Sequence, residues 1–146
     1  MRRTLEDFTP GETIVTPGVT VTAGMIVDFA LSYDPQPIHL DIPAAEAGPY
    51  GVLIASGFQT LALGFRMLVQ SGVFASGLGS PGMENVRWPR PLTPGDTIHA
   101  VATVTSVRPS QSKPDRGILA LHVEMLNQRG EIVCSADGTF FIRRRE

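Results

Sequence analysis

An aspartate and a histidine five positions apart are the residues of this chain best suited to acid–base chemistry. Asp34 and His39 lie in the segment Tyr33-Asp34-Pro35-Gln36-Pro37-Ile38-His39-Leu40-Asp41. A carboxylate beside an imidazole favours the charged ring, and such a pair can take a proton from a bound water molecule. Aspartate before proline is also common in turns, so the spacing alone leaves a purely structural role open.

Two prolines stiffen the segment that carries this pair. Pro35 and Pro37 fix their own φ angles and remove two backbone donors. Each also disfavours the helical region for the residue before it, which pushes Asp34 and Gln36 toward extended conformations. The sequence therefore predicts a rigid turn, with no helix, that holds the two side chains in a fixed relation.

Helices are predicted on both sides of the turn. Thr22 is a suitable N-cap for a helix that leads into it, and Asp41 for a short helix over residues 43–47. The longest helix is predicted to begin after Ser56 and to end at Ser71 and Gly72. Its apolar residues recur at helical spacing with a single charged residue among them, so we expect it to be nearly enclosed.

The second half of the chain is predicted to be mainly β-structure. The Gly- and Ser-rich residues 73–82 indicate a loop, and alternating apolar residues predict strands after it. The expected strands cover residues 84–90, 96–108, 117–125 and 131–143, with a turn at 127–130 and a further extended segment at 13–21. One apolar helix followed by long antiparallel strands predicts an α+β fold in which the sheet wraps the helix.

Composition limits the classes of function. The 146 residues fit one domain spanning 1–146, and a net charge of −2 argues against a nucleic-acid-binding protein. The single cysteine, Cys134, suits a reducing compartment, and no segment has the length of a membrane span, so we expect a cytoplasmic protein that does not bind membranes. A mean hydropathy of +0.09 favours an oligomer that hides apolar surface.

Four motifs in order carry a resemblance to a known family. They are Asp34-Pro35-Gln36-Pro37-Ile38-His39-Leu40-Asp41; Val52-Leu53-Ile54-Ala55-Ser56-Gly57-Phe58; Val86-Arg87-Trp88-Pro89-Arg90-Pro91-Leu92 with Pro94-Gly95-Asp96-Thr97; and Asn127-Gln128-Arg129-Gly130-Glu131. In this order the chain resembles the MaoC-like dehydratases, which have the hotdog fold and include the (R)-specific enoyl-CoA hydratases. The resemblance implies a homodimer or higher homo-oligomer that adds water reversibly to a trans-2-enoyl-CoA.

The resemblance also assigns roles to residues. It implies that Asp34 and His39 are catalytic and that Gly57, at the start of the central helix, helps to bind the thioester oxygen as it becomes negative. Ser56 replaces a histidine of the family pattern and Gln36 an asparagine. Ser56 is therefore expected to cap the helix, line the pocket or both, and Gln36 to position the turn.

Arg87 and Arg90 are candidates for contact with the phosphates of CoA, although arginines on strands are more often solvated. The histidines His99 and His122 are expected to be ordinary sheet residues. No His/Cys cluster has metal-ligand spacing and no glycine-rich phosphate loop follows a strand, so we expect no metal and no cofactor, CoA entering only with the substrate. Two alternatives stay open, an acyl-CoA thioesterase and a non-catalytic acyl-CoA-binding protein.

Overall fold

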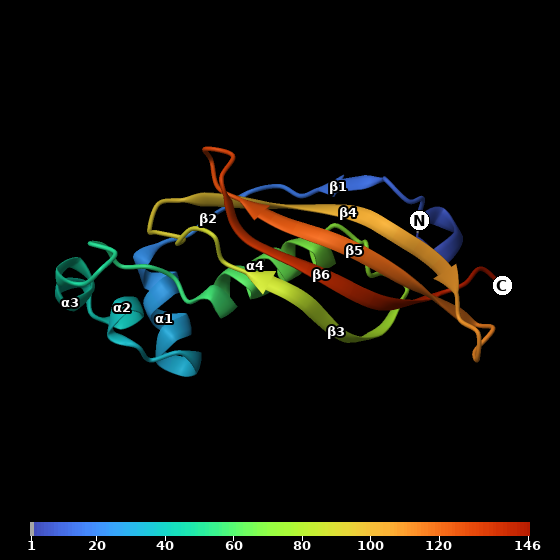
Figure 1. The fold of residues 1–146 in the computed structure, drawn as a ribbon, viewed down its shortest axis with the longest axis horizontal. Coiled ribbons are helices and arrows are strands. Elements are labelled where there is room, and N and C mark those ends of the chain that lie inside the picture. Colours follow the sequence, from blue (N-terminus) through green and yellow to red (C-terminus); the bar gives the residue numbers. More distant parts are fainter. Residues whose placement is uncertain (1) are drawn as a thin grey trace.

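In the computed structural model, which describes residues 2–146, one antiparallel sheet lies along a long helix (Figure 1). The strands are hydrogen-bonded in the order β1-β4-β5-β6-β3, and β2 also pairs with β4. The strand bounds are β1 (Thr13–Val15), β2 (Val19–Thr20), β3 (Gly77–Arg87), β4 (Thr97–Pro109), β5 (Arg116–Leu126) and β6 (Ile132–Arg143). The helices are η1 (Leu5–Asp7), α1 (Ala23–Tyr33), α2 (Pro37–Leu40), α3 (Ile42–Ala47) and α4 (Gly57–Gln70).

The prediction of an α+β hotdog fold is confirmed. Helix α4 lies against one face of the sheet, and α1, α2 and α3 gather beyond one end of it, while both termini lie at the other end (Figure 1). Buried and partly buried residues alternate along β4 and β5, because successive side chains of a strand point to opposite faces. The inward-facing side chains pack with Met67 and Leu68 of α4 to form the core. No helix within residues 2–146 combines the length and apolarity needed to cross a membrane.

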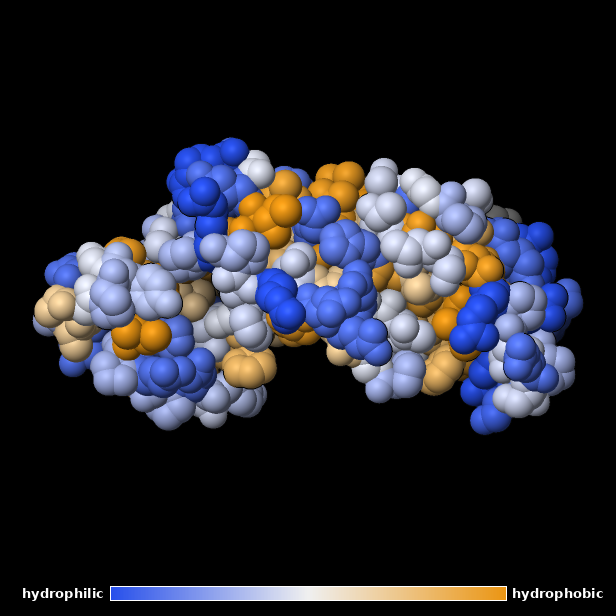
Figure 2. All heavy atoms as spheres, viewed as in Figure 1, coloured by the Kyte–Doolittle hydropathy of each residue, from blue (hydrophilic) through white to orange (hydrophobic). Residues whose placement is uncertain are grey.

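The prediction that the central helix is nearly enclosed is wrong for a single chain. The sheet covers only one side of α4, and Phe58, Phe65 and Val69 are 63%, 40% and 49% exposed. Exposed apolar side chains in a row on one helix face mark a surface that another element or molecule covers. Figure 2 shows the molecule from the side of the sheet, with hydrophilic residues gathered at the end that carries both termini and at the turn between β5 and β6, and with apolar residues between them.

Two local predictions also differ from the structure. Residues 73–82 are not all loop, because β3 begins at Gly77. Gly79 and Gly82 adopt φ angles of +119° and +155°, and the pairing of β3 with β6 shifts register at these glycines. Glycine permits such irregular strand geometry, and the same composition is typical of loops, which is why the sequence pattern misled.

The turn after α1 contains a short helix that the prolines were expected to exclude. Pro37 occupies the first turn of α2, where the missing N–H costs nothing because it would have no helical partner. Gln36 is extended as predicted, with φ −80° and ψ 143°. The capping predictions are confirmed: Thr22 accepts the N–H of Met25 and Asp41 accepts the N–H of Ala44.

Asp96 links two turns at one end of the sheet. Its carboxylate accepts the backbone N–H and the hydroxyl of Thr93 and the side-chain amide of Gln128, at 2.8–3.0 Å. Burial alone would raise the pKa of Asp96, but hydrogen bonds from Gln128 and Thr93 and the charge of Arg129 outweigh it and lower the pKa. The carboxylate is therefore ionised at neutral pH and joins the turn before β4 to the turn between β5 and β6.

We expect Asp96→Asn to destabilise the fold by about 1–3 kcal/mol. The NH₂ group that replaces one carboxylate oxygen is itself a donor, so it cannot accept the hydrogen bonds that the carboxylate accepts from Thr93 and Gln128. Since folding lowers the pKa of Asp96, its contribution is present above the unfolded pKa of about 4 and is lost as pH falls through the folded pKa. Urea unfolding at pH 7 and pH 3 measures both effects. A difference between wild type and variant that is as large at pH 3 as at pH 7 would contradict this account.

Candidate active site

The structure brings Asp34 and His39 together. Asp34 ends α1 as its C-cap, and His39 is the third residue of α2, so the Pro-rich turn fixes their relation. The Nε2 atom of His39 is 3.3 Å from Oδ2 of Asp34, and the side chains are only 6% and 16% exposed. The two basic atoms thus converge on one point at the edge of the protein interior.

Two neutral donors hold the carboxylate of Asp34. The amide of Gln36 donates to Oδ1 and the hydroxyl of Ser56 donates to Oδ2, each at 2.7 Å. These two hydrogen bonds lower the pKa of Asp34 against the effect of burial, and the proximity of His39 lowers it further. Asp34 is therefore a carboxylate at neutral pH, with one oxygen shared between Ser56 and the imidazole.

Ser56 acts on Asp34 and does not contact the space in front of it. It is fully buried, and it precedes α4 as the N-cap residue, but its side chain makes no capping hydrogen bond to the helix. The prediction that this hydroxyl caps the helix is wrong, because it is directed to Asp34 instead. Ser56 also does not line the cavity described below, so its part in the site is to orient and stabilise the carboxylate.

A backbone carbonyl determines the tautomer of His39. Its Nδ1 atom lies 2.7 Å from the carbonyl oxygen of Ile54, which can only accept, so Nδ1 carries a proton. In the neutral ring Nε2 is then an unprotonated acceptor that faces Asp34. A water molecule beside the pair could donate one hydrogen to each of these two acceptors, and this is the arrangement needed to hold and deprotonate water.

The start of α4 supplies backbone donors beside the pair. Within residues 2–146, the N–H groups of Gly57 and Phe58 have no hydrogen-bond acceptor, and the positive end of the helix macrodipole lies there. A Cβ on Gly57 would come within 2.5–2.7 Å of indole atoms of Trp88, so only glycine fits. The indole N–H of Trp88 also donates to the Gly57 carbonyl at 2.7 Å.

These groups line one cavity of about 350 Å³. Asp34, Gln36, His39 and Gly57 line it together, and the remaining wall is mainly apolar. Its other lining residues are Ile38, Tyr50, Ile54, Ala55, Phe58, Thr60, Trp88, Pro89, Arg90, Pro91, Leu92 and Val133. The volume suits a small organic group, with polar atoms at one place to orient it.

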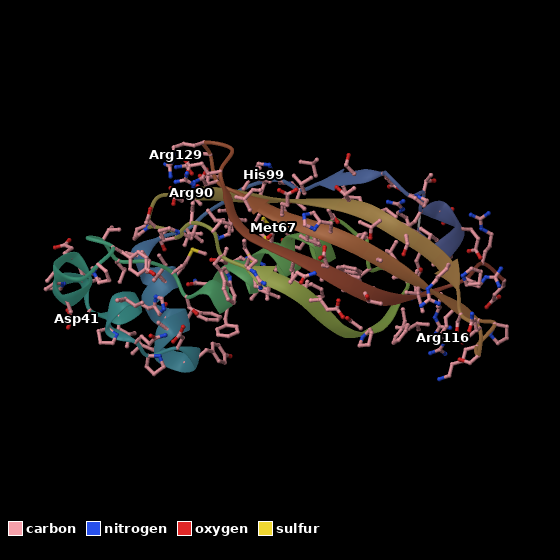
Figure 3. The ribbon with its side chains drawn as sticks, in the orientation of Figure 1. Asp41, Met67, Arg90, His99, Arg116 and Arg129 are labelled. Atoms are coloured by element: carbon pink, nitrogen blue, oxygen red, sulfur yellow. The ribbon has the colours of Figure 1, made fainter. Side chains whose placement is uncertain are left out.

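The two arginines proposed for phosphate contact lie differently. Arg90 lines the cavity, and its Nε is 3.5 Å from a Glu131 oxygen, while Arg129 binds the other oxygen at 3.1 Å. Figure 3 shows Arg90 and Arg129 near one another at the β5–β6 turn. Arg87 does not line the cavity, and its guanidinium donates to the carbonyl of Val86.

Three lining side chains that carry a polar group were not predicted as part of the site: Tyr50, Thr60 and Trp88. Trp88 was recognised only as the residue between two arginines, and nothing in its sequence neighbours shows that it covers the start of α4. Thr60 follows Gly57 by one helical turn, a spacing that could have indicated it. Among residues 2–146, no three His, Cys, Asp or Glu side chains come together in a way that could hold a metal ion.

Fold and site together define a hotdog domain with an Asp–His pair at the start of its central helix. The model of the MaoC like domain matches residues 7–123, so the chain belongs to the MaoC-like domain family. The crystal structure of a MaoC-like dehydratase from Rhodospirillum rubrum is 40% identical and superposes with a TM-score of 0.92 over 99% of each chain.

Two curated relatives extend the comparison. The YdeM protein of Bacillus subtilis is 28% identical over 141 residues, which are 96% of this chain and 99% of that protein. The 3-hydroxyacyl-thioester dehydratase Z of Mycobacterium tuberculosis is 36% identical over 94 residues, 61% of each chain. The similarity therefore spans nearly the whole chain in one case and its larger part in the other.

We expect Ser56→Ala to raise the pKa of Asp34, because it removes one of the two donors that stabilise the carboxylate. Carbon-detected NMR titration of the Asp34 carboxyl group measures this directly. Thr60→Ser serves as a control that leaves the hydrogen bonds of Asp34 intact. An unchanged Asp34 titration in a folded Ser56→Ala protein would show that the hydroxyl does not support the charge.

Proposed function

We propose that this protein is a hydro-lyase that reversibly hydrates a trans-2-enoyl-CoA, or a related acyl thioester, to the (R)-3-hydroxyacyl thioester. The observation that carries the proposal is the convergence of Asp34 and His39 beside the free N–H groups of Gly57 and Phe58 in one cavity. Membership of the MaoC-like family and similarity to a 3-hydroxyacyl-thioester dehydratase support the same chemistry.

The Asp–His pair would provide the water. Water held between the Asp34 carboxylate and Nε2 of His39 attacks C3 of the enoyl group, and the pair takes its proton. The same proton is then delivered to C2, so one water molecule is added and no group leaves. General acid–base assistance of this kind contributes about 10²–10⁴-fold to a rate.

The start of α4 would stabilise the charge that develops. As water adds to C3, the thioester oxygen gains enolate character, and the N–H of Gly57 or Phe58 can donate to it. The reaction transfers only water, so it needs no metal and no cofactor besides the CoA of the substrate. Arg90, at the mouth of the cavity, is placed to meet a phosphate of CoA, whereas Gln36 and Ser56 hold the carboxylate.

Asp34→Asn and His39→Ala are each expected to reduce turnover by about 10²–10⁴-fold while the fold is retained. The assay is loss of absorbance at the enoyl-thioester band, with crotonyl-CoA and a longer 2-enoyl-CoA as substrates. Asp41→Asn is the matched control, since Asp41 caps α3 and lies outside the cavity. Full activity in both site variants would refute the assignment.

The same preparation distinguishes the two alternatives. Release of free CoA from a saturated acyl-CoA, detected with a thiol reagent, would indicate a thioesterase. Binding of an enoyl-CoA in calorimetry, without turnover of either substrate, would indicate an acyl-CoA-binding protein. The Asp–His pair favours hydration over both, because simple binding requires no base and no aligned imidazole.

We further propose that two copies of the chain form the working unit. Phe65, on the exposed face of α4, lines one hollow together with Gly77 and Gly79 of β3. Within residues 2–146, β3 is an edge strand whose outer hydrogen-bonding groups have no partner strand. A second copy that added its own β3 would extend the sheet and cover Phe58, Phe65 and Val69. Edge strands and exposed apolar faces both favour such association.

Val69→Lys is expected to weaken the dimer, because it places a charge on the exposed face of α4 without disturbing the core. Sedimentation at micromolar concentration should give twice the 15.7 kDa chain mass for the wild type and a lower mass for the variant. Thr105→Lys, on an exposed part of β4, adds the same charge elsewhere and should leave the mass unchanged. A monomeric wild type would contradict the proposal.

A further inference from the structure

Strand β3 contains one extra residue just before it reaches the site. Glu84 pairs with Asp137 and Arg87 pairs with Ser135, so three steps along β3 match two steps along β6. Asn85 lies in this bulge with φ +53°, and among residues 2–146 it is the only residue other than glycine with positive φ. Asparagine is one of the few residues that adopt this left-handed conformation readily.

The bulge determines which face of the sheet Trp88 takes. Glu84 and Arg87 pair with partly buried residues of β6, on the face of the sheet directed away from α4. The next position, Trp88, then falls on the inner face, where its indole contacts Gly57. Without the extra residue the alternation would be reversed, since a shift of one residue moves every side chain to the other face. Trp88 would then point away from α4.

A chain of hydrogen bonds on the outer face of the sheet holds this bulge. The amide of Asn85 donates to Oδ2 of Asp137 at 2.9 Å, and Nδ1 of His122 donates to Oδ1 at 2.7 Å. Nε2 of His122 lies 3.7 Å from the carboxylate of Glu124 on the same strand. The Asn85 amide and the His122 ring lower the pKa of Asp137 against desolvation, so the acceptor is a carboxylate.

None of these side chains lines the cavity, yet the chain of contacts leads into it. From His122 it passes through Asp137 to Asn85, then along three backbone steps to Trp88 and across to the carbonyl of Gly57. Trp88 restrains the turn whose N–H groups face the proposed substrate. A displacement of about 1 Å at such a position can cost up to two orders of magnitude in rate.

We propose that Asn85 and Asp137 are positioning residues of the site, which fix the β3 bulge so that Trp88 packs on the first turn of α4. Their effect on activity rests on the proposed hydratase function, whereas their effect on Trp88 does not. The two consequences are therefore measured separately. His122 supports the same arrangement from β5, on the side of Asp137 opposite Asn85.

Trp88 is the only tryptophan of the chain and reports its own position by fluorescence. Asn85→Ala removes the amide and disfavours positive φ, whereas Asn85→Gly removes the amide but permits the backbone conformation. We expect Asn85→Ala to shift the Trp88 emission and to raise its quenching by acrylamide, with a smaller change in Asn85→Gly. Glu84→Ala is the matched control, an exposed neighbour on the same strand whose loss should change neither quantity.

Activity on crotonyl-CoA supplies the second readout. We expect roughly a tenfold lower kcat in Asn85→Ala, with little change in KM, and a similar direction in Asp137→Ala. Wild-type emission and quenching in a folded Asn85→Ala protein would overturn the proposal. If Asn85→Ala does not fold, wild-type emission and quenching in Asn85→Gly would overturn it instead. Altered fluorescence with wild-type kcat would overturn the link to catalysis. An inactive wild type would refute the hydratase assignment and leave the fluorescence test of Trp88 intact.

Discussion

The site depends on one hydrogen bond, from the buried hydroxyl of Ser56 to the carboxylate of Asp34. It joins the residue before α4 to the residue that ends α1, and so links the helices at the end of the sheet to the helix that lies along it. A buried carboxylate tends to become neutral unless donors stabilise its charge. Here Ser56 and Gln36 provide those donors, and the same geometry leaves one carboxylate oxygen directed at His39.

The remaining parts of the site follow from how the sheet meets α4. The sheet covers only one side of the helix. Met67 and Leu68 anchor the C-terminal half of α4 in the core, while its N-terminal end borders the cavity. Trp88, carried by the end of β3, closes the side of the first turn and excludes any residue larger than glycine at position 57. The edge of the sheet thus shapes the helix terminus, although the two elements are far apart in sequence.

Charged and polar side chains outside the cavity serve this arrangement in different ways. Asp96 joins the turn that follows Leu92 to the turn between β5 and β6. Glu131 holds Arg90 at the cavity mouth. The Asn85–Asp137–His122 chain lies on the opposite face of the sheet and acts on the register of β3. The glycine–aspartate and asparagine–glutamine motifs of the sequence are therefore largely structural, since they fix turns instead of contacting a substrate.

Periodicity and turn residues in the sequence predicted an α+β fold and the order of its main elements, because these are local properties of the chain. The hotdog fold and the family were predicted by the resemblance of four motifs, in order, to a known family. The sequence also marked Asp34 and His39 as a candidate acid–base pair, since the two prolines predict a rigid turn between them and the resemblance implies a catalytic role. Tertiary structure alone decided that Ser56 bonds to Asp34 instead of capping α4, that Trp88 packs on Gly57 and that Arg90 but not Arg87 lines the cavity. Each of these depends on which face of a strand or helix meets a distant segment. A bulge of one residue, or a sheet that covers half a helix, changes that face without a clear signal in the sequence.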